Sequence, residues 1–502
     1  MSIAFVRCLS VAGRGAVALL LSLSWLGHGG RVWAEIVTLQ ILQLNDVYEI
    51  TPLSGGTVGG LARVATIRQG LIEENPNTLT VMAGDFFSPS ALGTAVVDGD
   101  RLAGEQMVNT LNHLGLDLAT FGNHEFDVKE HQFRSRLAES EFQWFSGNVR
   151  TAAGEAWDNV PPYFVTTVTG ENGAEIRVGF VGVTLPSNPA PYVSYLDPFV
   201  QMQQSVAEIR DETEIIVGLT HVAIADDQRF AAQIPEIDLI LGGHEHENIQ
   251  LWRGQDFTPI FKADANARTV YIHQLAYDTD LEKLTINSRL QLVNEAIAPD
   301  PQLEAIINYW QQKAFDAFRD SGFTPEAIVA VSPIALDGLE SSVRQAPTNL
   351  TDLIAKSMLT AAPDAELAIF NSGSIRIDDV LPASAISQYD VIRILPFGGE
   401  IITVDLTGAV LAQTLNQSLA NVGTGGYLHT AAVSQEATTQ QWLINNVPLD
   451  AAKIYRVAIT DFLISGKETG LDFLNLDNPD ITAVENYGDV RFALIQQLQQ
   501  KW

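Results

Sequence analysis

Short apolar runs alternate with amphipathic segments through the first half of the chain. Runs of strand length cover residues 39–44, 79–83, 114–121, 178–184, 214–219 and 237–241. Two other segments, 59–70 and 104–114, space their apolar residues as on one face of a helix. Strand-like and helix-like segments in alternation are typical of layered α/β folds, because helices must cover the faces of a sheet. For residues 35–285 we therefore expect an α/β sandwich.

The second half begins with a longer helical pattern. Residues 301–319 place five apolar side chains on one side: Ile306, Ile307, Trp310, Ala314 and Phe318. We interpret this segment as a helix that connects two α/β units; alternatively, it belongs to the second unit. The predicted division is a leader over 1–34, a first domain over 35–299, a linker over 300–330 and a second domain over 331–502.

The leader has the pattern of a secretory signal. Arg7 and Arg14 precede an apolar run over 16–26, and Ala34 ends a plausible cleavage site. The alternative is an uncleaved anchor. The only cysteine, Cys8, falls inside this segment, so the remaining chain would have neither thiol nor disulfide. We expect a secreted or periplasmic protein with no stable membrane span after cleavage of the signal.

The charge balance excludes one class of partner. The formal net charge is −31, and no basic stripe offsets it, so nucleic-acid polymers would be repelled. A small anionic substrate would need a local cluster of cations. The oligomeric state does not follow from the sequence.

Six potential metal ligands come just after the strand-like runs, at the positions where open α/β sheets carry functional loops. They are Asp46, Asp85, Asn123, His221, His244 and His246. An amide oxygen such as that of Asn123 is a useful ligand only when stronger ligands surround the same ion. Mixed carboxylate, amide and imidazole ligation suits manganese, zinc or iron, and does not choose among them.

Six ligands are enough for two divalent ions. We expect Asp85 to bridge them, Asp46 and His246 to complete one ion, and Asn123, His221 and His244 to complete the other. Two ions ~3.5–4 Å apart activate a water and stabilise both the attacking and the leaving oxygen of a phosphate ester. The pattern therefore predicts a two-metal phosphoester hydrolase.

His124 has a separate predicted role. Its neighbour Asn123 points at an ion, so His124 can face the substrate and protonate the leaving oxygen. Asp127, one turn further on, would orient that imidazole and raise its basicity. His124 and Asp127 are thus the predicted catalytic pair.

These blocks resemble a known family. Asn45-Asp46, Gly84-Asp85, Gly122–Asp127, Thr220-His221 and Gly242–His246 are similar to blocks of the calcineurin-like metallophosphoesterases. Together with the C-terminal half, they resemble the 5′-nucleotidase family, which includes UDP-sugar hydrolases and 2′,3′-cyclic-nucleotide phosphodiesterases. The resemblance implies a four-layer α/β/β/α catalytic domain, a connecting helix and a second α/β domain that binds the substrate.

One position departs from the family pattern. The first block is usually Asp-x-His with both side chains on one ion, whereas this chain has Asp46-Val47-Tyr48. A phenol with a pKa of ~10 is a weaker ligand than imidazole unless a metal deprotonates it. Tyr48 is either a phenolate ligand, which would favour iron, or not a ligand. From the sequence we favour the second reading, in which one ion is held less tightly or through an extra water.

The C-terminal half supplies the cations that an anionic substrate needs. Arg376 follows the strand-like run 366–370, and Arg344 and Arg393 are further candidates, because a guanidinium fork suits phosphate. In the resemblance, Asn371, Gly373 and Arg376 match the nucleotide-binding block residue by residue.

Two aromatic residues are implied by the resemblance to clamp the base. Phe397 lies in Pro396-Phe397-Gly398-Gly399, and Phe473 lies in a block that keeps only part of the family's Gly-Asp-Gly-Phe pattern. A clamp of two rings would accept purines and pyrimidines alike, since every base has a π-face.

The sequence thus predicts a secreted enzyme with two divalent ions that converts nucleoside 5′-phosphates into nucleosides and phosphate. A 2′,3′-cyclic-nucleotide phosphodiesterase or a UDP-sugar hydrolase is the alternative within the same resemblance. A catalytically impaired nucleotide-binding relative is a third reading, which Tyr48 allows and the His124–Asp127 pair argues against.

Overall fold

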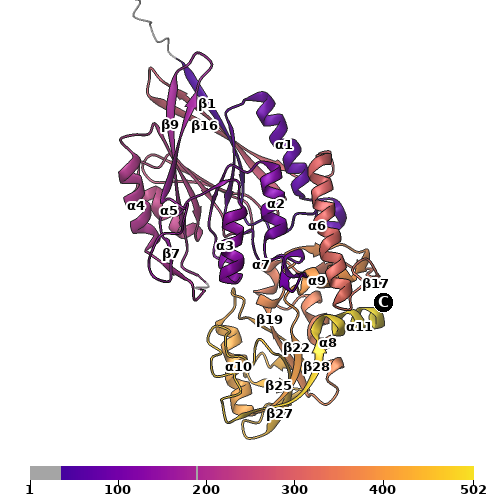
Figure 1. Cartoon of the computed structure of the whole chain (residues 1–502). Helices are drawn as coiled ribbons and strands as arrows, with labels where there is room; N and C mark the ends of the chain where they lie inside the picture. Colours follow the sequence, from indigo (N-terminus) through magenta and orange to yellow (C-terminus); the bar gives the residue numbers. More distant parts are fainter. Residues whose placement is uncertain (1–34, 188–189) are drawn as a thin grey trace, which may run out of the picture.

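The computed structural model describes residues 35–187 and 190–502 (Figure 1). The signal predicted for 1–34, including Cys8, lies outside these residues. Across the part of the chain that is described, no helix combines the length and the apolar character needed to cross a membrane.

Two six-stranded sheets form the centre of the N-terminal half. The first contains, in spatial order, β16 (Lys283–Leu292), β15 (Thr269–Asp278), β1 (Ile36–Leu44), β2 (Thr78–Ala83), β5 (Leu118–Thr120) and β6 (Gln143–Trp144). The second contains β13 (Ile249–Arg253), β14 (Thr258–Lys262), β12 (Leu239–Gly242), β11 (Ile215–His221), β9 (Glu175–Thr184) and β8 (Tyr163–Thr169). Strands β1, β2, β5 and β6 are parallel, as are β9, β11, β12 and β14. Parallel strands bring their carboxyl ends to one edge, where loops can converge.

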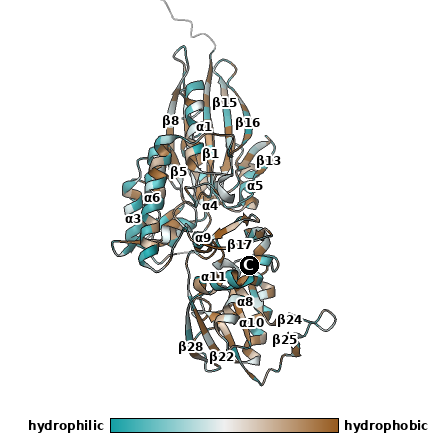
Figure 2. Ribbon diagram, turned by 90° about the vertical axis from the view of Figure 1, so that its right-hand side faces the viewer, coloured by the Kyte–Doolittle hydropathy of each residue, from teal (hydrophilic) through white to brown (hydrophobic). Residues whose placement is uncertain are grey.

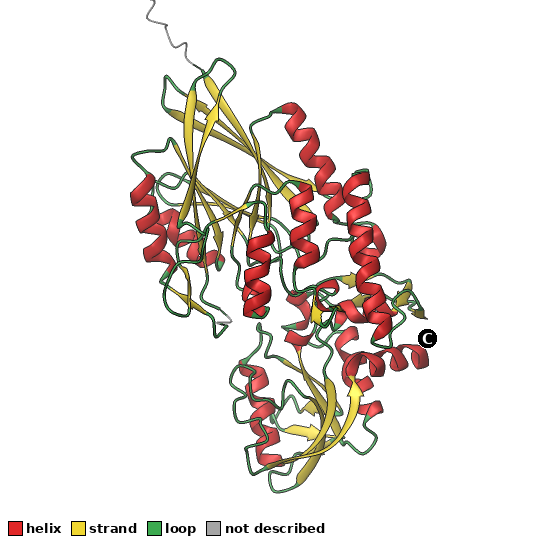
Figure 3. Ribbon diagram, in the orientation of Figure 1, coloured by secondary structure: helices red, strands yellow, loops and turns green. Residues whose placement is uncertain are grey.

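Helices cover the outer faces of both sheets (Figure 3). Over the first sheet lie α1 (Leu61–Glu74), α2 (Glu105–Leu114), α3 (Glu130–Glu139) and α6 (Pro301–Asp320), and over the second lie α4 (Pro198–Ile209) and α5 (Ile224–Gln233). Between the sheets, Ile41 of β1 and Val81 of β2 belong to one buried cluster with Val217 and Leu219 of β11. The predicted four-layer α/β/β/α arrangement is confirmed.

The C-terminal half is a second α/β unit. Its five-stranded sheet has the order β23 (Leu428–Ala431), β19 (Leu367–Asn371), β27 (Ile454–Thr460), β22 (Glu400–Thr407) and β28 (Ile481–Asp489). Helix α10 (Gly408–Ala420) packs on one face, whereas α8 (Asn349–Ala361) and α11 (Val490–Lys501) pack on the other. The short helices α7 (Glu340–Val343) and α9 (Gln388–Ile394) lie towards the N-terminal half (Figure 1).

The helix predicted over 301–319 is α6. Asp300 caps its first turn by accepting from the backbone N–H groups of Gln302 and Leu303. Ile307, Trp310 and Phe318 are buried, and Figure 2 shows α6 striped in apolar and polar colours, as expected for a helix with one packed face. The helix packs against α1 and α2, and its last turns belong to the core that continues into the C-terminal half. The domain boundaries themselves stay predictions.

One predicted strand is shorter than expected. The apolar run over 114–121 is not one strand, because Leu114 ends α2 and only Leu118–Thr120 pair as β5. Gly115 causes the break: it has a left-handed backbone (φ 84°) and caps the helix by donating to the carbonyls of Leu111 and Asn112.

Candidate active site

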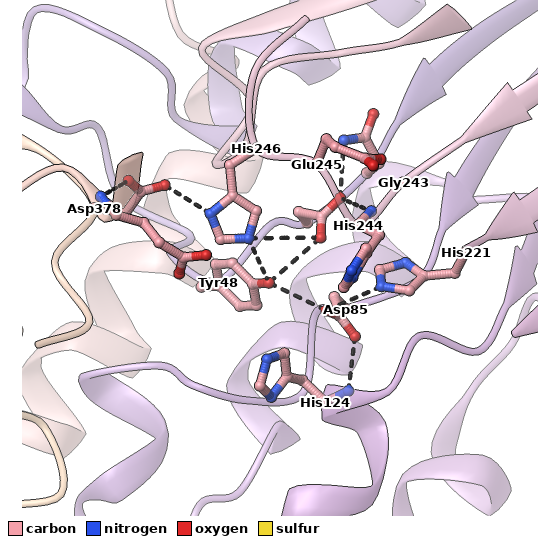
Figure 4. A network of polar contacts seen from close by, with 12 residues as sticks. Tyr48, Asp85, His124, His221, Gly243, His244, Glu245, His246 and Asp378 are labelled. Carbon is pink, nitrogen blue, oxygen red and sulfur yellow. Dashed lines mark hydrogen bonds and ion pairs between the residues drawn. The ribbon is translucent and has the colours of Figure 1, made fainter. Parts of the chain in front are cut away.

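Four of the predicted metal ligands, Asp85, His221, His244 and His246, lie close together in Figure 4. Asp46 and Asp85 each lie two residues beyond their strands, β1 and β2, and His221 is the last residue of β11. Ligand atoms of these three side chains lie within 4.8 Å of one another. Residues far apart in sequence therefore form one cluster of potential ligands.

Burial makes this cluster favour a cation. Asp46 and Asp85 are 0% and 1% exposed, and burial raises the pKa of Asp46 above its usual value. Burial alone would lower the pKa of His221, but the carboxylates of Asp85 and Asp46 outweigh it and raise that pKa to about 9. Two buried carboxylates are stable side by side only when positive charge lies between or beside them.

Two orphaned atoms fit metal ligation. Oδ1 of Asn123 is buried and accepts no hydrogen bond from any group in the described structure. His221 donates from Nδ1 to the carbonyl of Ala83 at 2.7 Å, which leaves Nε2 to face Asp85 Oδ2 at 3.1 Å. A buried amide oxygen without a partner and an imidazole nitrogen that faces a carboxylate are groups that can ligate divalent ions.

Three of the predicted ligands have a strained backbone. Asp46, Asp85 and His244 adopt positive φ values of 51°, 59° and 82°. Non-glycine residues in this region cost free energy and cluster at functional sites. Gly122 allows the close approach, because a Cβ there would overlap Oδ1 of Asp85.

Glu125 holds the loop that carries Asp85. Its buried carboxylate accepts from the backbone N–H groups of Gly122, Asp85, Phe86 and Phe87 at 2.5–3.1 Å. Burial, with Asp85 nearby, raises the pKa of Glu125 to about 7. Sequence reasoning gave this residue no role, although it stands inside the most informative block.

Lys262 holds the loops that carry the histidines. This fully buried residue at the end of β14 donates to the carbonyls of Val222 and Gly243, both at 2.7 Å. Its charge is balanced by ion pairs with Asp227 and Glu245. A lysine at the end of an apolar strand is the sequence signal for this role, and the sequence analysis did not use it.

Tyr48 lies among the predicted ligands of the first ion. Its hydroxyl oxygen is 3.2 Å from both Asp85 Oδ2 and His246 Nε2, and 3.4 Å from Asp46 Oδ1. The side chain is 4% exposed, and burial together with Asp85 and Asp46 raises the pKa of the phenol well above its usual value. The hydroxyl thus lies among the predicted ligand atoms, while the raised pKa favours the neutral phenol, and the role of Tyr48 stays a prediction.

His246 and His244 occupy different surroundings. Nε2 of His246 faces Asp46 Oδ1 at 3.8 Å, while Nδ1 is 2.8 Å from Oδ2 of Asp378. The ring of His244 stands edge-on to His221, with centroids 5.5 Å apart. Burial and His221 lower the pKa of His244 to about 3, so its imidazole is neutral and can ligate.

His124 and Asp127 form the predicted pair within the 3-10 helix η3 (His124–Asp127). The imidazole Nδ1 lies 2.5 Å from Asp127 Oδ2, and the backbone N–H of His124 donates to Asp85 Oδ1 at 2.7 Å. Burial lowers the pKa of His124, but Asp127 and Asp85 outweigh it and raise that pKa. A pair so arranged can hold a proton for a leaving group.

A cleft of about 1100 Å³ joins this centre to the C-terminal half. The N-terminal half lines it with Asn123, His124, Asp127 and His244, and the C-terminal half with Arg344, Asn371, Gly373, Arg376 and Phe397. The guanidinium of Arg376 lies 5.7 Å from the ring centroid of Phe397. Arg344 pairs with Glu340 at 2.6 Å. Two predicted ligands, the His124–Asp127 pair, two arginines and an aromatic ring thus line one space.

The second predicted aromatic residue is placed elsewhere. Phe473 does not line the cleft; its half-buried ring packs against the core of the C-terminal half. Phe462 lines the cleft instead and is 43% exposed, close to the 40% of Phe397. Arg393 is also absent from the lining, because it is buried beside Asp379 and Asp390. Phe462 was missed by sequence reasoning, although it follows the end of β27 by two residues.

Two family profiles match the chain. The calcineurin-like phosphoesterase profile matches residues 39–248, and the profile of the 5′-nucleotidase C-terminal domain matches residues 328–475. The two matches fall on the sandwich and on the second α/β unit.

Curated relatives contain the same combination. Bovine 5′-nucleotidase is 26% identical, with 88% of this chain and 86% of that protein covered. A trifunctional nucleotide phosphoesterase of Bacillus subtilis is 27% identical over 77% of this chain, which spans only 28% of that longer protein.

Solved structures share the fold. A 5′-nucleotidase precursor from Thermus thermophilus superposes with a TM-score of 0.75 at 23% identity, covering 92% of this chain and 96% of that one. A sulfate thiohydrolase, SoxB, from Thermus thermophilus reaches 0.68 at 17% identity, covering 92% and 94%. These structures show the fold, and the family profiles with the curated relatives show that the chain belongs to the 5′-nucleotidase family of calcineurin-like phosphoesterases and is a metal-dependent phosphoester hydrolase.

Proposed function

We propose that this enzyme converts nucleoside 5′-phosphates into nucleosides and phosphate. The observation that carries the proposal is the cleft, which places Arg376 and the exposed rings of Phe397 and Phe462 opposite the His124 side of the metal cluster. A phosphate needs cations and a base needs an aromatic face, so a nucleotide matches both ends of this space. The bovine relative, which is named a 5′-nucleotidase, supports the same substrate class.

The cofactor in this proposal is a pair of divalent ions, held by Asp46, Asp85, Asn123, His221, His244 and His246, with Asp85 shared. Ions bound there would polarise the phosphoryl oxygens and lower the pKa of the attacking water. Tyr48 is included as a ligand of the first ion because its hydroxyl lies 3.2–3.4 Å from three of the other ligand atoms. A phenolate in that set favours iron at this position.

The chain's own groups perform the remaining steps. His124 donates a proton to the leaving ribose oxygen, and Asp127 keeps the imidazole oriented and stabilises its charged form. Arg344 and Arg376 hold the nucleotide from the C-terminal half of the cleft, where Asn371, held by Glu468 at 2.9 Å, also lies. Phe397 and Phe462 are proposed to stack on the base.

Metal-dependent turnover of a substrate panel tests this function. The panel contains a nucleoside 5′-monophosphate, a 2′,3′-cyclic nucleotide, a UDP-sugar and 4-nitrophenyl phosphate, each with manganese, zinc or iron and with a chelator. The proposal requires the highest kcat/KM on the monophosphate. Faster turnover of the cyclic nucleotide or of the UDP-sugar would assign the corresponding alternative, and nucleotide binding without turnover would indicate the catalytically impaired relative. The SoxB match shows why this panel is needed, since the fold alone does not choose a substrate.

The site of action is a further part of the proposal. That the enzyme works outside the cytoplasm rests on the signal pattern over 1–34. N-terminal sequencing of the exported protein checks it, with a mature start at Glu35 as the expected result.

A further inference from the structure

A residue of the C-terminal half contacts His246, a predicted metal ligand of the N-terminal half. Asp378 lies between Asn371 of β19 and the short strand β20 (Val380–Leu381), 132 positions from His246. Its Oδ2 is 2.8 Å from Nδ1 of His246, and Figure 4 shows the carboxylate pointing at that ring. No family block drew attention to this residue.

Asp378 is itself held in place from several sides. Its Oδ1 accepts from the backbone N–H of Glu340 at 2.8 Å, and its main-chain carbonyl accepts from Arg268 of the N-terminal half. Its backbone has φ 38°, in the left-handed region that non-glycine residues seldom adopt. Surrounding contacts must therefore determine its position, because the local backbone does not favour it.

The contact fixes the tautomer of His246. With Nδ1–H donated to a carboxylate, Nε2 is free to accept a cation, and it already faces Asp46 Oδ1 and the hydroxyl of Tyr48. Carboxylates in this position orient metal-bound histidines and raise their basicity.

We propose that Asp378 is a positioning residue for the metal centre, so that the first ion is held at full affinity only when the C-terminal half is docked as it is here. This inference rests on the proposed function, in which His246 is a ligand. Linkage then works in both directions: a movement that separates Asp378 from His246 weakens that ion, and binding of the ion favours the docked arrangement.

The neighbouring Asp379 provides a matched control. It joins the halves through Ser54 at 3.1 Å and Arg268 at 3.3 Å, and lies 3.6 Å from Arg393, but it does not touch His246. Asp379→Asn therefore removes charged contacts between the halves and leaves the Asp378–His246 contact, and with it the docked arrangement, in place.

The test is metal titration by calorimetry on the full metal-free chain, with Mn²⁺ and with Zn²⁺. Asp378→Ala should weaken one of the two binding steps roughly 10–100-fold, which is the usual cost of losing such a partner, and leave the other step unchanged. Asp378→Asn keeps an acceptor oxygen and should recover part of the loss. Asp379→Asn should change metal affinity less than threefold, even if it lowers Tm.

His246→Ala separates the possible failures. If it abolishes one binding step while Asp378→Ala leaves that step unchanged, the positioning role is wrong and the proposed ligand set stands. If neither variant alters binding, His246 is not a ligand. This inference is then wrong, and so is the place of His246 in the proposed ligand set. Equal losses in Asp378→Ala and Asp379→Asn would assign the effect to docking alone and overturn the specific role of Asp378.

Discussion

Nδ1 of His124 lies 2.5 Å from Oδ2 of Asp127, and the backbone N–H of the same histidine donates to Asp85. His124 thus contacts Asp127 through its side chain and the proposed bridging carboxylate, Asp85, through its backbone. His124 lines the cleft, so its imidazole can donate a proton to a substrate bound there.

Removal of this imidazole should affect chemistry and leave metal binding intact. We expect His124→Ala to lower kcat by roughly 10²–10⁴-fold, the usual contribution of a general acid, because no other group replaces its proton. Metal content, measured by elemental analysis, should stay at the wild-type value. Loss of one metal equivalent would show that His124 is a ligand.

The hydroxyl of Tyr48 should contribute to the first ion. Tyr48→Phe keeps the ring and removes the oxygen, so one metal-binding step should weaken, and an iron-loaded protein should lose the visible absorption of a phenolate–iron bond. Tyr48→His, which restores the family pattern, should bind at least as tightly as wild type. Unchanged affinity and absorption in Tyr48→Phe would support the earlier reading that Tyr48 is not a ligand.

The aromatic clamp can be tested with three matched substitutions. Phe397→Ala and Phe462→Ala should each raise KM for a nucleoside monophosphate, since stacking on a base contributes ~1–3 kcal/mol. Phe473→Ala should lower Tm and leave KM unchanged, because its ring packs in the core. A raised KM in Phe397→Ala and Phe473→Ala, but not in Phe462→Ala, would return the clamp to the two residues that the sequence indicated.

Stability should depend on the protonation of His273. This imidazole is fully buried between Ser288 and Gln43, and burial lowers its pKa to about 3. The unfolded chain takes up the proton near pH ~6.5 and the folded chain does not, so stability is lost as the pH falls below that value, by at most about 1.4 kcal/mol per pH unit.

Denaturant unfolding of the metal-free protein between pH 7 and pH 4.5 measures this dependence. His273→Gln should show a shallower loss than wild type, whereas the exposed His113→Gln should follow the wild-type curve. Parallel curves for all three proteins would contradict the assignment to His273.

Much of the site could be predicted because it obeys one local rule. Asp46 and Asp85 follow a buried strand by two residues and His221 ends one, and parallel strands bring such ends together. The same rule, applied to β27, would have identified Phe462. The family resemblance indicated Phe473 for the clamp instead, although the block around it keeps only part of the family's Gly-Asp-Gly-Phe pattern.

Other parts depend on distances that a sequence does not show. Asp378 reaches His246 only because the C-terminal half docks beside the cleft. Tyr48 could be judged only after the positions of Asp85 and His246 were known. Glu125 and Lys262 act through hydrogen bonds with backbone groups that only the folded chain brings within reach.

The central claim is that one cleft combines a metal centre for hydrolysis with separate residues that bind the nucleotide. Arg376 lies in the C-terminal part of that cleft, and 4-nitrophenyl phosphate has no nucleoside for that half to hold. The decisive measurement is kcat/KM for a nucleoside 5′-monophosphate and for 4-nitrophenyl phosphate, in wild type and in Arg376→Ala, with metal present. We predict that Arg376→Ala loses nucleotide turnover severely and keeps aryl phosphate turnover near wild type. Equal losses on both substrates would contradict the claim and leave a phosphatase whose C-terminal half does not select the substrate.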